Sequence, residues 1–308
     1  MAYFLGIDGG GSKTTCAVGD EVSLLATVTA GPSNITRVGE ARARESLQAA
    51  IGQACAAAGI EPRQLQRACI GAAGAGRKEI AGVVHQIVAA IIPAEIRVVG
   101  DMAIALEAAF GPGPGVIVIA GTGSIAYGRD AHGATARAGG WGFAISDEGS
   151  AHWIGRTAIA TLLRAADQAD ENSQGAQPSL LFRELQAAWK LDSLEQLART
   201  ANSTSDFAAL LPVVLAAAEN GDAVAQQVLR QAAAELARLA KIIVHRLFSD
   251  SAVSAVPMAM AGGVFRHALK VRELFYNDVR AAHSNVVLKG DVIEPVHGAL
   301  QMARRTPS

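Results

Sequence analysis

Both halves of the sequence follow one order of elements, βββαβαβα, which predicts an α/β protein with two domains of duplicated topology. Each half opens with a short apolar strand, a glycine-rich turn and a second apolar strand, at residues 3–18 and 116–129. Strands and helices then alternate, and the glycine- and proline-rich segment 111–115 separates the halves. Because ligand sites favour domain interfaces, we expect a ligand in a cleft between the two domains.

In the first half, apolar spacing and breaker residues define the elements. Strands are expected at 3–7, 14–18, 24–29, 68–71 and 96–99. Helices are expected at about 39–58, from 77 to the break at Pro93, and at 102–110.

The second half repeats this order around an additional helical segment. Strands are expected at 116–120, 124–129, 135–138, 257–261 and 286–288, and helices at 150–167, 222–247, from Phe265 onward and at 296–304. An Ala- and Leu-rich helical insertion is expected at about 170–220, opened by the polar loop 172–175.

The turn after the first strand offers parts for binding both phosphate and a divalent cation. Glycines at 9–11 expose backbone N–H groups and allow positive φ, and such a nest of amides binds phosphate. Lys13 adds positive charge, and Asp8 at the strand end could hold a cation or its water shell. A P-loop is excluded because Ser12 separates Gly11 from the lysine and the next residues favour a strand.

The second turn, Gly121-Thr122-Gly123-Ser124, matches the loose dinucleotide fingerprint. That fingerprint must open a helix, whereas the residues after it are typical of a strand and a turn. Each turn alone is more often an ordinary glycine-rich connection. Two strand–glycine–hydroxyl–strand hairpins in one chain favour phosphate binding.

Composition excludes several other classes of protein. The 308 residues carry a net charge of -1 and are 50% hydrophobic, with a pI of about 6.7, so we expect no nucleic-acid partner. A long apolar run and a basic, apolar leader are both lacking, so we expect a cytoplasmic protein without a membrane partner. Cys16, Cys55 and Cys69 lie in apolar elements and are expected to be buried thiols.

Four segments carry a resemblance to a known family: 6–14, 119–124, 260–265, and 138–142 together with 146–151. In them the chain resembles the actin-like ATPase and sugar kinase superfamily, whose two ribonuclease-H-like domains close on ATP. It is most similar to the N-acetylglucosamine kinase branch, which is related to the benzoyl-CoA reductase activator ATPases. The resemblance implies domains at 1–110 plus 292–308 and at 111–291, with the last helix packing back on the first domain.

The resemblance also implies the ligands and the residues that bind them. Mg²⁺ would be organised by Asp8, and the phosphates of ATP would lie against Gly10, Gly11, Ser12, Lys13, Thr14, Gly121, Thr122 and Gly123. Adenosine would lie against Gly262 and Gly263, with Ala208 near adenine. The amino sugar would contact Asn34, Asp101, Ser124, Gly140, Trp141, Gly142 and Asp147, with Asp101 as the catalytic base. We also expect a homodimer.

Ordinary structural roles compete with several of these assignments. Asp101 precedes a helix and could be its N-cap, a role common for Asp. Acids also gather at helix starts, as Asp147 does. Asn34 could be a turn residue, and Trp141 could plug a loop.

The function expected is ATP-dependent phosphorylation of an amino sugar, N-acetylglucosamine, to its 6-phosphate. A glucosamine kinase is the alternative within this class. An ATPase activator of a reductase would need cluster-binding cysteines in its second half, but residues 121–308 contain none. A sugar sensor without turnover often carries a DNA-binding domain, and we expect none here because the sequence opens directly on the first hairpin.

Overall fold

The computed structural model describes residues 2–168, 179–203, 206–249 and 254–305. The chain divides into two compact units: Met1–Ile117 with Tyr127–Thr135 and Asp291–Ser308, and Val118–Ala126 with Ala136–Gly290. The domain boundaries expected from the sequence stay a proposal, and each unit is described by itself.

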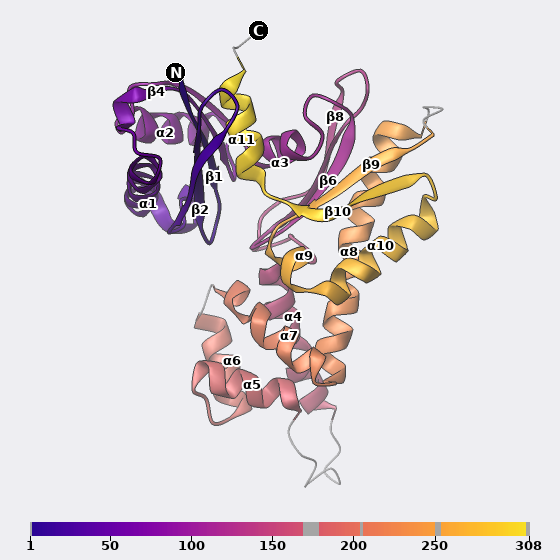
Figure 1. Ribbon diagram of the computed structural model, residues 1–308. Coiled ribbons are helices and arrows are strands. Elements are labelled where there is room, and N and C mark those ends of the chain that lie inside the picture. The colour runs from indigo at the N-terminus through magenta and orange to yellow at the C-terminus, as the bar shows by residue number, and fades with distance from the viewer. Residues whose placement is uncertain (1, 169–178, 204–205, 250–253, 306–308) are drawn as a thin grey trace. The chain divides into compact units, whose positions relative to one another are not determined.

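The first sheet has the strand order β3-β2-β1-β4-β5, and Figure 1 labels β1, β2 and β4 of this sheet. Its strands are β1 (Tyr3–Gly9), β2 (Thr14–Gly19), β3 (Leu24–Ala30), β4 (Leu65–Ala72) and β5 (Glu95–Gly100). The first three form an antiparallel meander, whereas β1, β4 and β5 run parallel. The carboxyl ends of three strands therefore meet at one edge of this sheet.

Helices cover both faces of the first sheet. Successive side chains of a strand point to opposite faces, and here both faces carry buried apolar side chains. Leu5 and Ile7 pack with the helices α1 (Ile35–Ala57) and α2 (Lys78–Ala89). Phe4 and Ala17 point to the other face and pack with α3 (Asp101–Phe110) and α11 (Pro295–Arg304). The last helix thus completes the core of the first unit.

Two glycines let α11 approach its neighbours closely. A Cβ on Gly298 would lie 2.0 Å from the Ile104 carbonyl oxygen of α3, and one on Gly6 would lie 2.4 Å from the Leu300 nitrogen. At the other end, Arg305 pairs with the buried Glu107 of α3 at 2.6 Å. The helix is therefore held against both α3 and β1.

The second sheet has the order β10-β9-β6-β7-β8, so β8-β7-β6-β9-β10 corresponds position by position to the first sheet. Its strands are β6 (Gly115–Ala120), β7 (Ser124–Arg129), β8 (Thr135–Gly139), β9 (Val256–Ala261) and β10 (Val286–Ile293). The predicted α/β class with a duplicated order of elements is confirmed.

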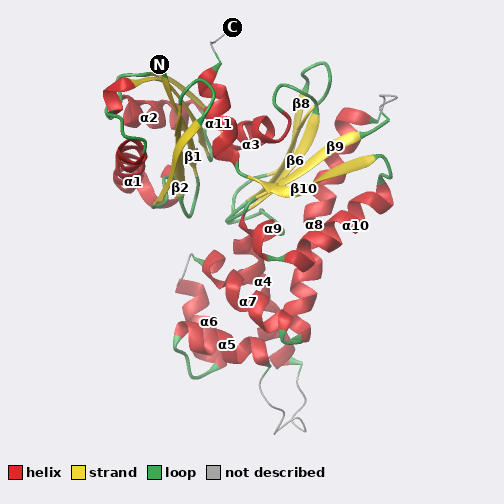
Figure 2. Cartoon of the chain, in the orientation of Figure 1, coloured by secondary structure: helices red, strands yellow, loops and turns green. Residues whose placement is uncertain are grey.

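Helices of the second half pack on one another around α8 (Ala223–Phe248), which contacts α4 (Ala151–Asp167) and α10 (Leu269–Ala282). The described part of the insertion is helical, as predicted (Figure 2). It contains α5 (Leu180–Trp189), α6 (Leu194–Ser203), the short η3 (Phe207–Leu210) and α7 (Leu211–Glu219). The polar loop expected at 172–175 lies outside the described residues.

Several boundaries differ from the sequence prediction. The helix expected from Gly39 already begins at Ile35, because Asn34 caps an extra turn that Gly39, at φ 78°, separates from the main helix. The helix expected from Phe265 is two helices, α9 (Gly263–His267) and α10, which meet at the non-helical Ala268. A short helix, η1 (Pro62–Gln64), was not predicted.

In the described part of the chain, none of the helices taken singly has the length and apolar character needed to cross a membrane. Two consecutive helical segments, Phe207–Glu219 and Ala223–Phe248, together have the length and apolar composition of a membrane span, but they are bent by 118° relative to each other.

Candidate functional site

The first glycine turn joins β1 to β2 and is closed by backbone hydrogen bonds. The Gly10 N–H donates to the Lys13 carbonyl (3.0 Å), and the Gly10 carbonyl accepts from the N–H groups of Ser33 and Asn34 (3.2 Å each). A Cβ on Gly10 would lie 2.9 Å from the Lys13 carbonyl oxygen. Gly11 is half-buried, whereas Ser12 and Lys13 are exposed at the tip. The segment is a hairpin, as predicted, with a strand after Lys13.

Thr14 holds this turn to the loop that follows β3. Its side chain is fully buried, and its hydroxyl donates to the Gly31 carbonyl (2.8 Å) and lies 2.7 Å from the Ser33 hydroxyl. We therefore propose that Thr14 contributes to phosphate binding by shaping the turn.

Asp8 lies at the carboxyl end of β1 in an environment that resists ionisation. Burial raises its pKa to about 7, and the charges of Asp101 and Glu294 act in the same direction while Lys13 opposes them. A carboxyl group held in this way gains from a nearby cation.

Asp101 lies near Asp8 because of the strand register. Gly9, Ala72 and Gly100 are aligned across the parallel strands β1, β4 and β5. Asp8 directly precedes Gly9, and Asp101 directly follows Gly100. Asp101 is the first residue of α3, with Gly100 in the N-cap position. Its carboxylate accepts the Met102 N–H (2.9 Å), while burial raises its pKa.

Sequence reasoning missed Glu294, which precedes α11 and whose charge acts on Asp8. The sequence shows an acidic residue just before a proline at a predicted helix start. Acids are common at helix starts, so this signal alone does not indicate a functional residue. Its approach to Asp8 follows from the packing of α11 on β1.

The second glycine turn is held by the start of α4. The Gly121 N–H donates to the Gly123 carbonyl (2.9 Å). The carbonyls of Gly121 and Thr122 accept the N–H groups of Ala151 (2.8 Å) and His152 (3.4 Å). A Cβ on Gly121 would meet no atom within 4 Å, so one side of this turn is open.

Asp147 is buried against this second turn, in a left-handed conformation with φ 62°. Its Oδ1 accepts the Gly142 N–H (3.2 Å), and its Oδ2 would lie 2.6 Å from a Cβ on Gly123. Ser124 is buried as well and donates to the Glu148 carbonyl (2.8 Å). The turn and the segment 139–148 are therefore one packed structure. We call this segment the substrate loop, after the role that the resemblance implies for it.

Glycines in the substrate loop are required by its backbone. Gly140 has φ 70° and a Cβ there would lie 2.6 Å from Ile125, while Gly142 has φ 108°. Trp141 between them is 68% exposed, and the Arg137 guanidinium lies 4.1 Å from the centre of its ring. Trp141 is not part of a core.

Gly262 lies against the second turn at the end of β9. It has φ 99°, and a Cβ would lie 2.3 Å from the Ala120 carbonyl oxygen. Gly263 follows it as the first residue of α9.

Two further predicted residues have clear structural partners. The Asn34 side chain accepts from the Thr36 N–H (3.1 Å) and hydroxyl (2.7 Å), which makes it the cap of α1. Ala208 lies in η3, which packs on α4. The neighbouring Phe207 ring lies 5.2 Å from the His152 ring.

Each unit thus gathers its own set of predicted residues. The first unit brings together Asp8, the first turn and Asp101. The second brings together the second turn, Gly262, Asp147 and the substrate loop. In neither unit do three or more His, Cys, Asp or Glu side chains of the described residues form a group arranged to hold a metal ion.

Comparison with known proteins identifies the family. The model of the BadF/BadG/BcrA/BcrD ATPase family matches residues 5–303. The chain is 33% identical over 306 residues to N-acetylmuramic acid/N-acetylglucosamine kinase of Clostridium acetobutylicum, covering 99% of each chain. It is 27% identical over 318 residues to N-acetyl-D-glucosamine kinase of Dictyostelium discoideum, covering 97% of each.

A solved structure shows the same fold. A proposed N-acetylglucosamine kinase from Chromobacterium violaceum superposes with a TM-score of 0.76 at 24% identity, covering 98% of this chain and 99% of that one. The family match spans nearly the whole sequence and confirms the resemblance carried by the glycine motifs. The chain belongs to the BadF/BadG/BcrA/BcrD ATPase family.

Proposed function

We propose that the protein is an ATP-dependent kinase that transfers the γ-phosphoryl group of ATP to an amino sugar, N-acetylglucosamine, to give its 6-phosphate. The observation that carries this proposal is the pair of partly buried aspartates, Asp8 and Asp101, beside a glycine turn of the kind that binds phosphate. Two relatives that match over nearly their full length are named as kinases of N-acetylglucosamine, which supports this sugar as the acceptor. Glucosamine, which differs only in the 2-substituent, is the alternative acceptor.

ATP would bind through both turns, with Mg²⁺ organised by Asp8. Mg²⁺ is typically held by one or two carboxylates together with phosphate oxygens and waters, so it needs no cage of three acids. The raised pKa of Asp8 fits a carboxyl group whose charge a cation stabilises. When bound, the cation would neutralise negative charge on the phosphoryl group that is transferred.

Asp101 would act as the base that accepts the proton of the attacking hydroxyl. A base works best when its pKa is raised toward the working pH, and burial raises the pKa of Asp101. Asp101 is the first residue of α3 and not its N-cap, and its hydrogen bond with the Met102 N–H is compatible with this role. Phosphoryl transfer then depends mainly on positioning and charge stabilisation.

The sugar would be held by Asp147, Asn34 and the glycine-flanked indole of Trp141. Asp147 is fixed by the Gly142 N–H, and Ser124 supports it through Glu148. We propose that Gly262, Gly263 and Ala208 lie near adenosine. A cytoplasmic homodimer without nucleic-acid or membrane partners also stays a prediction.

Two aspartate variants test this assignment because they should fail differently. Asp101→Asn keeps the shape but cannot take the proton, so kcat should fall about 10²–10⁴-fold with the sugar KM nearly unchanged. Asp147→Asn should mainly raise the sugar KM, through loss of about 1.5–3 kcal/mol from a charge-assisted hydrogen bond. Asp20→Asn, in an exposed turn of the first unit, is the control. A wild-type kcat in a folded Asp101→Asn variant would contradict the proposed mechanism.

A further inference from the structure

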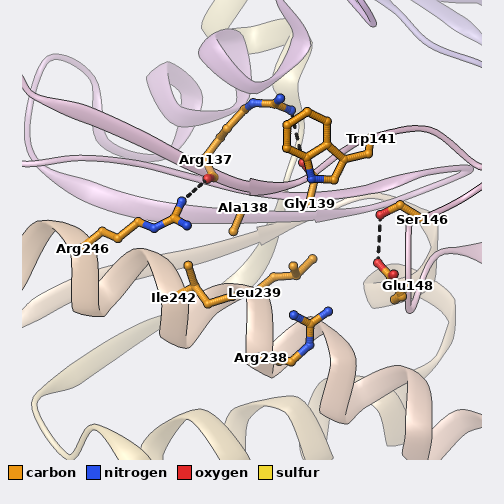
Figure 3. Close-up of a pocket in the computed structure, with 10 residues that line it drawn as sticks. All are labelled: Arg137, Ala138, Gly139, Trp141, Ser146, Glu148, Arg238, Leu239, Ile242 and Arg246. Atoms are coloured by element: carbon orange, nitrogen blue, oxygen red, sulfur yellow. Dashed lines mark hydrogen bonds between the residues drawn. The ribbon is translucent and has the colours of Figure 1, made fainter.

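A cavity of about 240 Å³ lies beside the substrate loop, and arginines line it from three directions (Figure 3). Arg137 belongs to β8, and Arg238 and Arg246 belong to α8. Ser146 and Glu148 border it from the substrate loop, together with Trp141. Its floor is apolar, formed by side chains of β8 and α8.

Two of the three guanidiniums are held by neutral groups, so their charge is not compensated by these bonds. Arg246 donates to the Arg137 carbonyl (2.8 Å). Arg137 donates to the Gly139 carbonyl (3.2 Å) and stacks on Trp141 at 4.1 Å. Arg238 differs, because its Nε pairs with Glu235 (2.8 Å). By contrast, the exposed Arg42 and Arg44 of α1 each pair with a glutamate.

Free hydrogen-bonding capacity accompanies this charge. A guanidinium carries five N–H donors in a planar fork that matches carboxylate and phosphate oxygens. The bonds found for Arg246 and Arg238 in the described part of the chain each use one donor group. Glu148 is the one carboxylate among the lining residues, and its Oε2 accepts from the Ser146 hydroxyl (3.0 Å). The cavity therefore keeps an excess of positive charge.

The cavity shares Trp141 with the proposed sugar site, but its lining includes neither Asp147 nor the second glycine turn. Asp147 turns toward Gly142 and Gly123, whereas its neighbours Ser146 and Glu148 line the cavity. The Glu148 carbonyl in turn accepts from Ser124 of the second turn. An occupant of the cavity would thus restrain both flanks of Asp147.

We propose that this cavity is an oxyanion site that binds the phosphate or carboxylate group of a small molecule other than the nucleotide. Arg246, Arg238 and Arg137 supply the charge and N–H donors, and the apolar floor and indole face contact the rest of the ligand. Occupancy holds the substrate loop and lowers the sugar KM. This kinetic consequence rests on the proposed function, whereas the binding does not.

Calorimetric titration with inorganic phosphate tests the site, with saturating Mg-ADP present so that the glycine turns are occupied. Wild-type protein should bind phosphate, and Arg246→Gln and Arg238→Gln should each weaken it about tenfold or more, since each removes a charge-assisted contact. Arg230→Gln is the matched control, because Arg230 is exposed on the same helix and does not line the cavity. Acetate in place of phosphate shows whether a carboxylate is preferred.

The outcomes separate the two levels of the proposal. If neither anion binds the ADP complex at millimolar concentration, or if both cavity variants bind like wild type, the site is refuted. If phosphate binds but leaves the sugar KM unchanged, the link to the substrate loop is refuted. A protein that fails to phosphorylate sugars would refute the proposed function while the calorimetric result stands.

Discussion

Asp8 should make the folded protein less stable as the pH rises, and replacing it with asparagine should remove this effect. Its pKa is raised from 3.8 to about 7 by burial and by the charges of Asp101 and Glu294. Between these values the folded state keeps a proton that the unfolded chain has released. The contribution of Asp8 to stability therefore falls as the pH rises from about 4 to about 7 and stays at its lowest above that range.

The size of the effect follows from the difference between the two pKa values. One pKa unit corresponds to about 1.4 kcal/mol, so the change from 3.8 to about 7 is worth up to about 4 kcal/mol. Asparagine is similar in shape and carries no charge. The gain in the free energy of unfolding of Asp8→Asn over wild type should therefore grow from near zero at about pH 4 to several kcal/mol above pH 7.

Urea unfolding of both proteins at about pH 4.5 and about pH 8 measures this gain. Asp20→Asn is the control with the opposite sign, because N–H groups of Ser23 and Val22 lower the pKa of this exposed carboxyl, and it should give no gain at either pH. An equal gain for Asp8→Asn at both pH values would refute a raised pKa of Asp8 in the folded protein. Loss of turnover together with the gain would identify a residue kept for function at the expense of stability.

Two glycine pairs give further predictions. Gly298→Ala drives a Cβ against the Ile104 carbonyl oxygen and should lower the free energy of unfolding by about 1–3 kcal/mol or more; Gly52→Ala, a helical site with nothing within 4 Å, should be neutral or stabilising by urea unfolding. Equal effects would contradict the close packing of α11. Gly123→Ala should displace the Asp147 carboxylate and raise the sugar KM about tenfold or more, whereas Gly121→Ala meets no protein atom and should instead weaken ATP binding. Calorimetry that finds wild-type ATP affinity in Gly121→Ala would remove that residue from the phosphate site.

Sequence reasoning succeeded where the signal was local. Both glycine turns were predicted as hairpins because the residues after them favour strands, and β2 and β7 follow them. By contrast, α1 begins four residues before the predicted start at Gly39, because Asn34 caps an additional turn there. Apolar spacing alone does not show whether a glycine lies at the start of a helix or interrupts a helix that has already begun.

Long-range contacts were less accessible. Glu294 affects Asp8 only because α11 packs on β1, which joins the two ends of the chain. The arginine cavity likewise depends on α8 packing beside β8, since Arg246 and Arg137 are 109 residues apart in the sequence. Neither arginine belongs to a motif. Their significance follows from the tertiary structure.

The most direct test of the proposed function is sugar-dependent ADP release from Mg-ATP, measured over N-acetylglucosamine, glucosamine, N-acetylmuramic acid and glucose, with the product examined by phosphorus NMR. N-acetylmuramic acid is included because the Clostridium acetobutylicum relative is named for it. We predict the highest kcat/KM for N-acetylglucosamine, a phosphate ester on its O6, and loss of turnover in Asp101→Asn. ADP release that does not depend on any of these sugars, or that persists unchanged in Asp101→Asn, would contradict the assignment as an amino-sugar kinase.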